Sequence, residues 1–143
     1  MTTDKIYFAG AISGGRDDWA FYQALVRLLG QYGTVLTEHI GSSELAITGE
    51  DLPDREVHDR DLAWLRESDC LVAEVTTPSL GVGYEIGKAT EWGKPVLCLF
   101  RLASGRRLSA MIAGSDRVTV AGYGDLSDAS RIIAAFFADH FNQ

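Results

Sequence analysis

The chain has 143 residues, of which 46% are hydrophobic and 10% aromatic, a composition that suits one soluble globular domain with a single core. Its net charge of -7 argues against a nucleic acid polymer or an anionic membrane as a partner, because both attract clustered lysine and arginine. A small anion still fits, since a few backbone amides and one arginine can bind it locally.

Cys70 and Cys98 both lie in apolar runs, DCLVAEV and PVLCLF. We interpret them as reduced core thiols of a cytoplasmic protein rather than as a disulfide or a metal pair. We find neither the basic start and apolar run of a signal peptide nor a run long enough to span a membrane. The sequence therefore predicts a cytoplasmic protein.

The first third of the chain alternates between short apolar strands and an amphipathic helix. Lys5–Ala9 predicts a strand that ends in a glycine-rich turn. Asp17 or Asp18 can cap the following helix, whose apolar residues recur at helical spacing. Thr34–Thr37 predicts a second strand, and the polar stretch Gly41–Leu52 is interpreted as a loop.

The alternation continues through the middle of the chain. Pro53 suits the first turn of a helix that runs to about Glu67. Cys70–Val75 predicts a buried strand, a helix is expected over about Val82–Trp92, and Pro95–Phe100 predicts the next strand. A basic loop, Arg101–Arg107, follows.

The last segments are a short helix over Leu108–Ile112, a weak strand over Val118–Val120 and an amphipathic helix over Leu126–His140. Strands that alternate with helices of about a dozen residues form right-handed βαβ units and a parallel sheet covered on both faces. The sequence therefore predicts a single α/β domain over the whole chain: a doubly wound, Rossmann-like, five-stranded parallel sheet flanked by helices.

The stretch Leu71–Gly87, LVAEVTTPSLGVGYEIG, joins a buried strand to a helix through a turn of small residues. Open α/β sheets bind ligands at such strand ends. The turn offers hydroxyls and backbone amides to an anion, and Glu85 is expected in the first turn of the helix. The helix dipole either simply stabilises this carboxylate or keeps it ionised as a nucleophile. The openness of a turn that contains Ser79, Gly81 and Gly83 favours the nucleophile.

Two other strand ends carry candidate residues. The turn Gly10–Arg16, GAISGGR, lacks the spacing of the dinucleotide fingerprint and the P-loop lysine, so it is either a plain turn or a ligand loop. Tyr7 precedes it and is a core residue or a catalyst. His39 follows the second strand and is a polar packing residue or a base.

A helix face supplies the remaining candidates. Asp54, His58, Asp61 and Leu65 share one face of the helix that starts at Pro53. Such a face is usually solvated. If it instead meets the turn before Glu85, Asp61 would supply the acid and base half of a glycosidase-like carboxylate pair.

Five segments carry a resemblance to a known family: IYFAGAISGGR, GTVLTEH, DLAWLRESD, VAEVTTPSLGVGYEIG and VLCLFR…GRRLSAMI. In order and over roughly residues 5–112, they closely resemble the 2'-deoxynucleoside 5'-phosphate N-hydrolases, relatives of the nucleoside 2-deoxyribosyltransferases. The long SLGVGYE-G and LSAMI segments are the most specific part of the likeness.

The resemblance implies catalytic roles for three residues. Glu85 matches the glutamate that attacks the anomeric carbon and forms a glycosyl-enzyme intermediate. Asp61 matches the aspartate that helps protonate the departing base and activates the water. Tyr7 matches a tyrosine close to the sugar and the nucleophile. The reaction implied needs no metal or other cofactor.

The resemblance also implies a set of binding residues. Ser79 and the amide of Gly81 match the cradle of the 5'-phosphate. Ser109 matches a serine that reaches the phosphate from the other subunit of a homodimer. His39 matches a histidine near the sugar and base.

The first turn departs from the family pattern. A family member has Ser-Ile-Arg where this chain has Ala11-Ile12-Ser13. We therefore expect the substrate contacts of this turn to come from Ser13, from Arg16, and from Ile12 and Gly14 through their amides.

These observations predict a homodimeric hydrolase that cleaves the N-glycosidic bond of a (2'-deoxy)nucleoside 5'-monophosphate. Three alternatives stay open: a nucleoside 2-deoxyribosyltransferase, a CMP-type ribonucleotide N-glycosidase and a nucleotide-binding module without turnover. A transferase would accept unphosphorylated nucleosides and exchange bases. A pure binding module needs neither Glu85 nor Asp61. Against the ribonucleotide N-glycosidase, Tyr7 favours deoxyribose over ribose as the sugar.

Overall fold

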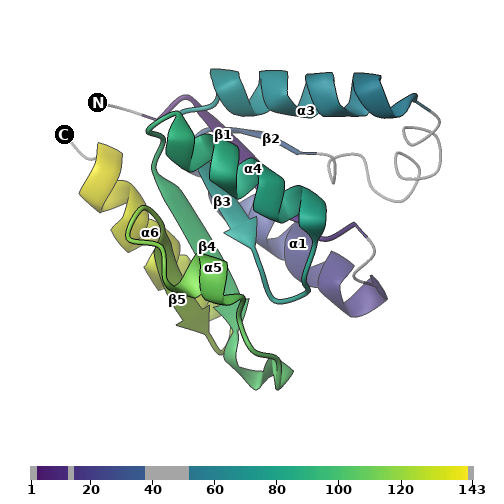
Figure 1. Ribbon diagram of the computed structural model, residues 1–143. Helices are drawn as coiled ribbons and strands as arrows, with labels where there is room; N and C mark the ends of the chain where they lie inside the picture. The colour runs from purple at the N-terminus through teal and green to yellow at the C-terminus, as the bar shows by residue number, and fades with distance from the viewer. Residues whose placement is uncertain (1–2, 13–14, 38–51, 142–143) are drawn as a thin grey trace.

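The computed structural model describes residues 3–12, 15–37 and 52–141, and the side chains of residues 15–17 lie outside the description. Its strands form one parallel sheet in the order β2-β1-β3-β4-β5 (Figure 1). The strands are β1 Lys5–Gly10, β2 Thr34–Leu36, β3 Cys70–Glu74, β4 Val96–Arg101 and β5 Thr119–Tyr123. The predicted five-stranded α/β sheet is confirmed.

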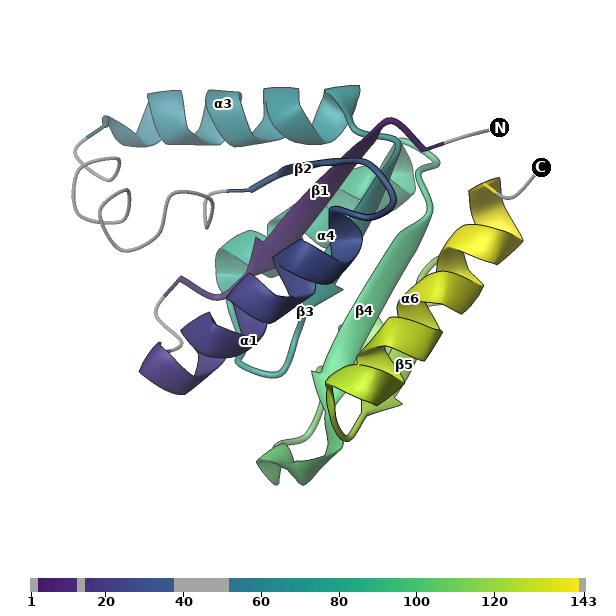
Figure 2. The same cartoon turned by 180° about the vertical axis from the view of Figure 1, so that it is seen from behind.

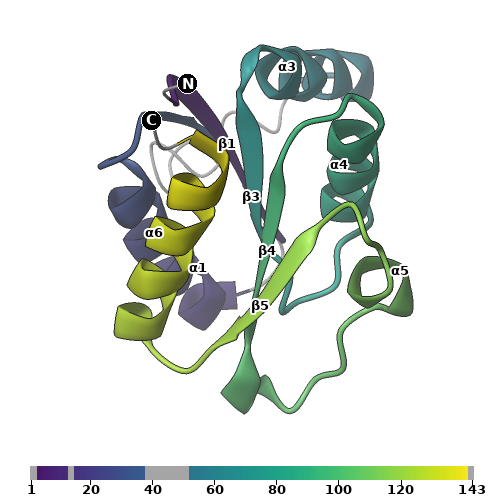
Figure 3. The same ribbon diagram turned by 90° about the vertical axis from the view of Figure 1, so that its left-hand side faces the viewer.

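Helices cover both faces of this sheet. They are α1 Gly15–Leu29, α3 Asp54–Glu67, α4 Leu80–Glu91, α5 Ala110–Ala113 and α6 Leu126–Phe141, with a 3₁₀ turn, η2, at Leu102–Ser104. Helices α1 and α6 lie on one face (Figure 2), and α3, α4 and α5 lie on the other, as the view along the sheet shows (Figure 3).

The alternation of side chains along each strand builds two separate cores. In β1, Ile6 and Phe8 pack toward α1 and α6, whereas Tyr7 and Ala9 pack toward α3 and α4. The strands β3 and β4 alternate in the same way, because both of their faces are buried and both must be apolar. This alternation fixes which strand-end side chains enter the candidate site and which face the opposite side.

Two predicted helix starts are wrong. Helix α1 begins at Gly15, so Asp18 lies inside the helix and is not its cap. Helix α4 begins at Leu80, two residues before the predicted Val82, so Glu85 lies in the second turn rather than the first. Helix α4 starts early because its cap is Ser79, whose Oγ accepts a hydrogen bond from the Val82 amide.

The strand order places a crevice between two neighbouring strands. From β1 the chain runs through α1 to β2 on one side, and β3 then pairs with the other side of β1. The helices that follow β1 and β3 therefore lie on opposite faces, which opens a crevice at the carboxyl ends of these strands. Gly10 and Glu74 are partners at this end of the β1–β3 ladder.

The two cysteines are free and buried, as predicted for core thiols. Burial raises the pKa of Cys70 and Cys98 to about 12, so both stay protonated and unreactive near neutral pH.

Of the polar stretch Gly41–Leu52, all but Leu52 lies outside the described residues. Within the described part of the chain, no helix combines the length and the apolar character that crossing a membrane requires.

Gly10 gives a stability test of the β1 turn. A Cβ atom at Gly10 would lie 2.8 Å from Cζ of Tyr22, whereas a Cβ at Gly87, on the exposed side of α4, would meet nothing within 4 Å. We expect Gly10→Ala to lower the free energy of unfolding by about 1–3 kcal/mol through overpacking. Gly87→Ala should raise it by about 0.5–1 kcal/mol, since alanine has the higher helix propensity.

Urea unfolding of both variants measures these changes as shifts of the midpoint. Equal midpoints for Gly10→Ala and the wild-type chain would contradict the close packing of Tyr22 on this turn.

Candidate active site

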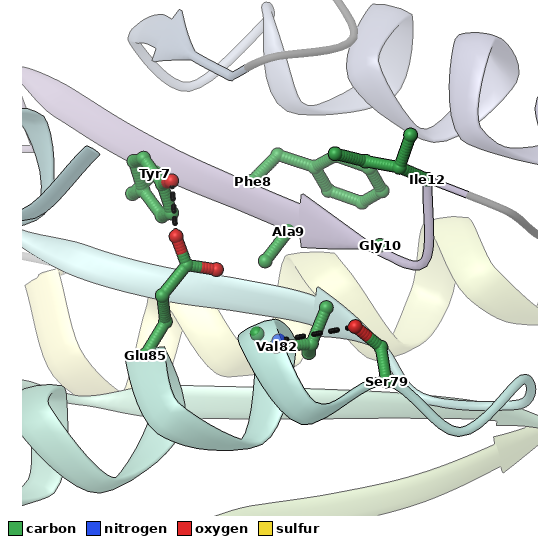
Figure 4. Close-up of a pocket in the computed structure, with 9 residues that line it drawn as sticks. Tyr7, Phe8, Ala9, Gly10, Ile12, Ser79, Val82 and Glu85 are labelled. Carbon is green, nitrogen blue, oxygen red and sulfur yellow. Dashed lines mark hydrogen bonds between the residues drawn. The ribbon is translucent and has the colours of Figure 1, made fainter. Parts of the chain in front are cut away.

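A pocket lies in the crevice where β1 and β3 end, and we call it the strand-end pocket. It is lined by Tyr7, Phe8, Ala9, Gly10, Ile12, Ser79, Gly81, Val82 and Glu85. Figure 4 shows side chains of β1 on one side of it and side chains from the start of α4 on the other. Five of the predicted site residues therefore line one crevice: Tyr7, Ile12, Ser79, Gly81 and Glu85.

Tyr7 and Glu85 face each other across this pocket. The Tyr7 hydroxyl donates a hydrogen bond to Oε2 of Glu85 at 2.5 Å (Figure 4). Tyr7 is buried in the sheet, while Glu85 is only partly buried. A rigid strand thus holds one carboxylate oxygen of Glu85, and Tyr7 is itself a core residue.

A second cavity of about 270 Å³ opens on the other side of Glu85, between α3 and α4. We call it the α3–α4 cleft, and it is lined by Leu52, Asp54, Val57, His58, Asp61, Leu62, Gly81, Tyr84 and Glu85. The predicted face of α3 meets the start of α4 here. Asp61 and Glu85 consequently line the same cavity, as a carboxylate pair requires.

Asp61 is buried, with 7% of its surface exposed, so this part of the helix face is not the solvated one. Its Oδ1 accepts a hydrogen bond from Nε of Arg60 at 3.0 Å. The Arg60 guanidinium also lies over the ring of Trp64, 4.9 Å from its centroid. Asp61 thus combines burial with a hydrogen bond from a cation, and it faces the same cavity as Glu85.

His58 and Tyr84 line the cleft beside the carboxylates, although the sequence predicts no role for either beyond the place of His58 on the Asp61 face. Nε2 of His58 lies 3.1 Å from the Tyr84 hydroxyl, and Nδ1 lies 2.9 Å from Oδ1 of Asp59. The spacing of His58 three residues before Asp61 could have identified it. Tyr84 carries no such signal, because an exposed helix tyrosine is ordinary.

Ser79 caps α4 rather than standing free in an open turn. In the first turn of the helix the Val82 amide donates to Oγ of Ser79, whereas the amides of Leu80 and Gly81 have no intrahelical carbonyl to bind. Gly81 is exposed there and belongs to the helix. The anion cradle predicted for this turn would therefore be formed by the N-terminus of α4.

Ser109 lies on another element and lines a third cavity, about 740 Å³ in volume, between α4 and α5. Its Oγ accepts a hydrogen bond from the Met111 amide and caps α5. This α4–α5 groove also includes Ser79, Leu80 and Tyr84 in its lining. Within one subunit, Ser109 therefore lies outside the strand-end pocket.

Several predicted contacts cannot be compared with the structure. Ser13, Gly14 and His39 lie outside the described residues, as does the side chain of Arg16. Of the predicted first turn, Ile12 is exposed and lines the strand-end pocket. Over the described residues, no group of three histidine, cysteine or acidic side chains is arranged to hold a metal ion.

The site thus combines an accessible glutamate, a buried aspartate in the same cleft and a set of helix N-terminal amides. A profile of the family described as nucleoside 2-deoxyribosyltransferase matches residues 6–117. The chain belongs to this family. The resemblance that the sequence segments indicated is confirmed, and the match spans the elements from β1 to the residues before β5.

Individual relatives carry more specific names. The chain is 60% identical over 114 residues to a 5-hydroxymethyl-dUMP N-hydrolase of Tetraodon nigroviridis, covering 78% of this chain and 80% of that protein. It is 58% identical over 113 residues to the protein of the same name in Mus musculus, covering 78% of this chain and 65% of that protein.

A solved structure, the CMP N-glycosidase of Clostridium botulinum, shares the fold with a TM-score of 0.66. The superposition covers 93% of this chain and 99% of that one, at 17% sequence identity. At this identity the likeness concerns the fold alone.

Proposed function

We propose that the protein hydrolyses the N-glycosidic bond of 2'-deoxynucleoside 5'-monophosphates and releases the free base and deoxyribose 5-phosphate. The observation that carries the proposal is the Tyr7–Glu85 hydrogen bond between the strand-end pocket and the cleft that also contains Asp61. The names of the relatives at 58–60% identity support the substrate class.

Because both cysteines are free thiols, we also propose a cytoplasmic location.

In the first step, Glu85 attacks C1' of the sugar while the bond from C1' to the base nitrogen breaks. The electron pair of that bond leaves with the base, and Asp61 donates the proton that neutralises it. The transition state resembles an oxocarbenium ion, which the Glu85 carboxylate stabilises and then traps as an ester. Tyr7 orients the attacking carboxylate by holding Oε2, so that Oε1 is directed at the sugar.

In the second step, water attacks C1' and releases Glu85 as a carboxylate. Asp61, now ionised, takes the proton from this water and returns to its starting state. The cycle therefore consumes one water and leaves both carboxyl groups unchanged. This sequence requires Asp61 to serve first as acid and then as base, which its position in the cleft beside Glu85 allows.

The 5'-phosphate is placed at the start of α4. Ser79 and the amide of Gly81 supply donors, and the positive end of the helix dipole favours the anion. Ser13, Gly14, Arg16, His39 and Ile12 stay predicted contributors to substrate binding. A phosphate held several atoms from C1' supplies binding energy that orients the sugar for attack.

The family profile favours one competing function, a 2-deoxyribosyl transfer in which a second base replaces water. The two reactions share the Glu85 ester and differ in the acceptor and in the need for phosphate. Incubating the protein with ribo- and deoxyribonucleoside 5'-monophosphates and with the matching nucleosides, with and without an added free base, separates them. Hydrolysis confined to monophosphates supports our proposal; base exchange on nucleosides would contradict it.

Replacing the proposed nucleophile tests the mechanism. We expect Glu85→Ala to lower the rate of base release from 5-hydroxymethyl-dUMP on the order of 10³-fold or more, because the charge that stabilises the transition state is lost. Binding of the monophosphate should change little, since its phosphate contacts remain. The control is Glu91→Ala, which removes an exposed carboxylate at the other end of the same helix. Near-normal turnover by Glu85→Ala would contradict the mechanism.

We also propose that the active form is a homodimer in which Ser109 reaches the phosphate bound by the partner subunit. The support is an exposed apolar surface on the α4–α5 groove, where Leu80 is 96% and Met111 83% exposed. Apolar side chains grouped in this way on a surface are typical of an interface. Ser109 lies beside these residues, at the edge that a second copy would cover.

Ser109→Ala should raise the KM for the monophosphate by roughly 10-fold, the loss expected for a hydrogen bond to a charged group, and leave nucleoside binding unchanged. Ser115→Ala is the control, because Ser115 caps a turn on the same segment in the same way.

Co-expression of Ser109→Ala with Glu85→Ala tests donation across the interface. In a mixed dimer, one site combines an intact Glu85 with the partner's intact Ser109, so part of the activity should regain the wild-type KM. A raised KM in all of the remaining activity would show that Ser109 acts within its own subunit.

A further inference from the structure

A cluster of buried charges lies beneath the crevice, on the α1 face of the sheet. Glu74 ends β3 with 1% of its surface exposed, Asp18 lies on α1 with 4%, and Arg101 ends β4. Nη2 of Arg101 donates a hydrogen bond to Oδ1 of Asp18, and its Nε lies 3.7 Å from Oε2 of Glu74. One guanidinium therefore serves two carboxylates, and we call these three residues the charge cluster.

Three neutral donors also hydrogen-bond to the Glu74 carboxylate. It accepts the Thr76 amide at 2.9 Å, the Thr76 hydroxyl at 2.8 Å and the Tyr123 hydroxyl at 2.5 Å. Burial and the hydrogen bond to Glu74 raise the pKa of Tyr123, so that this hydroxyl stays a donor. Buried ion pairs cost desolvation and seldom add net stability over apolar side chains, so the cluster is better explained by the positions that it fixes.

Those positions belong to the turn between β3 and α4. The Thr77 hydroxyl donates to Oδ2 of Asp18 at 2.5 Å, and the Arg101 amide donates to Oγ1 of Thr76 at 2.9 Å. Two consecutive residues of the turn are thus tied to α1 and to β4. Pro78 follows with its restricted backbone, and Ser79 comes next as the cap of α4.

The same cluster reaches the turn after β1. Tyr22 lies near Asp18 and Glu74, and burial together with the charges of these carboxylates raises its pKa. Its ring packs against Gly10, the residue that ends β1. The charge cluster and its neighbour Tyr22 therefore contact both turns that border the strand-end pocket.

We propose that Asp18, Glu74 and Arg101 are positioning residues, which act through Thr77 to place Ser79 and the first-turn amides of α4 at the 5'-phosphate. This inference rests on the proposed function and adds the residues that determine its phosphate selectivity. They act from the face of the sheet opposite to Glu85 and Asp61, without contacting the sugar. A change in the charge cluster therefore alters phosphate binding without altering the reacting carboxylates.

Thr77→Val tests the proposal, because it removes the hydroxyl that ties the turn to Asp18 and keeps the shape of the side chain. With 5-hydroxymethyl-dUMP as substrate we expect KM to rise roughly 3- to 10-fold, the range for one lost hydrogen bond, with kcat within about two-fold. The inhibition constant of the nucleoside 5-hydroxymethyl-deoxyuridine, measured as a competitor, should not change. Thr77→Ser restores the hydroxyl and should restore KM.

Thr90→Val is the matched control, since its hydroxyl donates to the Gly87 carbonyl within α4 and lies far from the turn. Thermal unfolding of every variant separates positioning from simple loss of fold.

An unchanged KM for Thr77→Val, or equal losses for monophosphate and nucleoside, would overturn the inference while leaving the proposed function intact. Failure of the wild-type chain to release base from the monophosphate would overturn the proposed function, and the inference with it.

Discussion

The hydrogen bond between the Tyr7 hydroxyl and the Glu85 carboxylate joins the most rigid part of the molecule to its proposed nucleophile. Tyr7 is held on β1 between two paired strands, whereas Glu85 lies on the accessible side of α4. Without this contact, a partly exposed glutamate could adopt several rotamers. With it, the carboxylate is fixed between the strand-end pocket and the α3–α4 cleft, and the roles proposed for Asp61 and the helix amides depend on that position.

The two faces of the sheet contribute differently to the same crevice. The side chains of alternate residues in β1 and β3 point to opposite faces, so Tyr7 meets α4 while Glu74 lies on the α1 face beside Tyr123 and Arg101. The carboxylates proposed to react consequently lie on the α3–α4 face, and the charge cluster lies on the α1 face. The arginine of the charge cluster pairs with Asp18 and Glu74 on that face, opposite to the proposed nucleophile.

Much of the fold could be predicted from local patterns. Local sequence is enough to predict β3 and β4, because each is a continuous apolar run. It also predicts the start of α3, because a proline precedes that helix. The start of α4 could not be placed, since Gly81 and Gly83 read as an open turn. Packing of Val82, Ile86 and Ala89 against the sheet outweighs the low helix propensity of these glycines.

The site was predicted where residues repeat at fixed spacing and missed where partners are distant in sequence. The spacing of Asp54, His58 and Asp61 predicts a common face, which does meet Glu85 across the cleft. Asp18 was predicted only as a helix cap, because its partner Arg101 lies 83 residues away. A pairing of this kind depends on the strand order, which places the end of β4 next to the end of β3.

The central claim is that Glu85 forms a covalent bond to the sugar. Its most direct test is to quench the wild-type protein with acid during turnover of 5-hydroxymethyl-dUMP and to map the modified peptide by mass spectrometry. Our account predicts a deoxyribosyl 5-phosphate ester on Glu85 that disappears when the substrate is exhausted. Base release with no adduct, or an adduct on a different side chain, would contradict it.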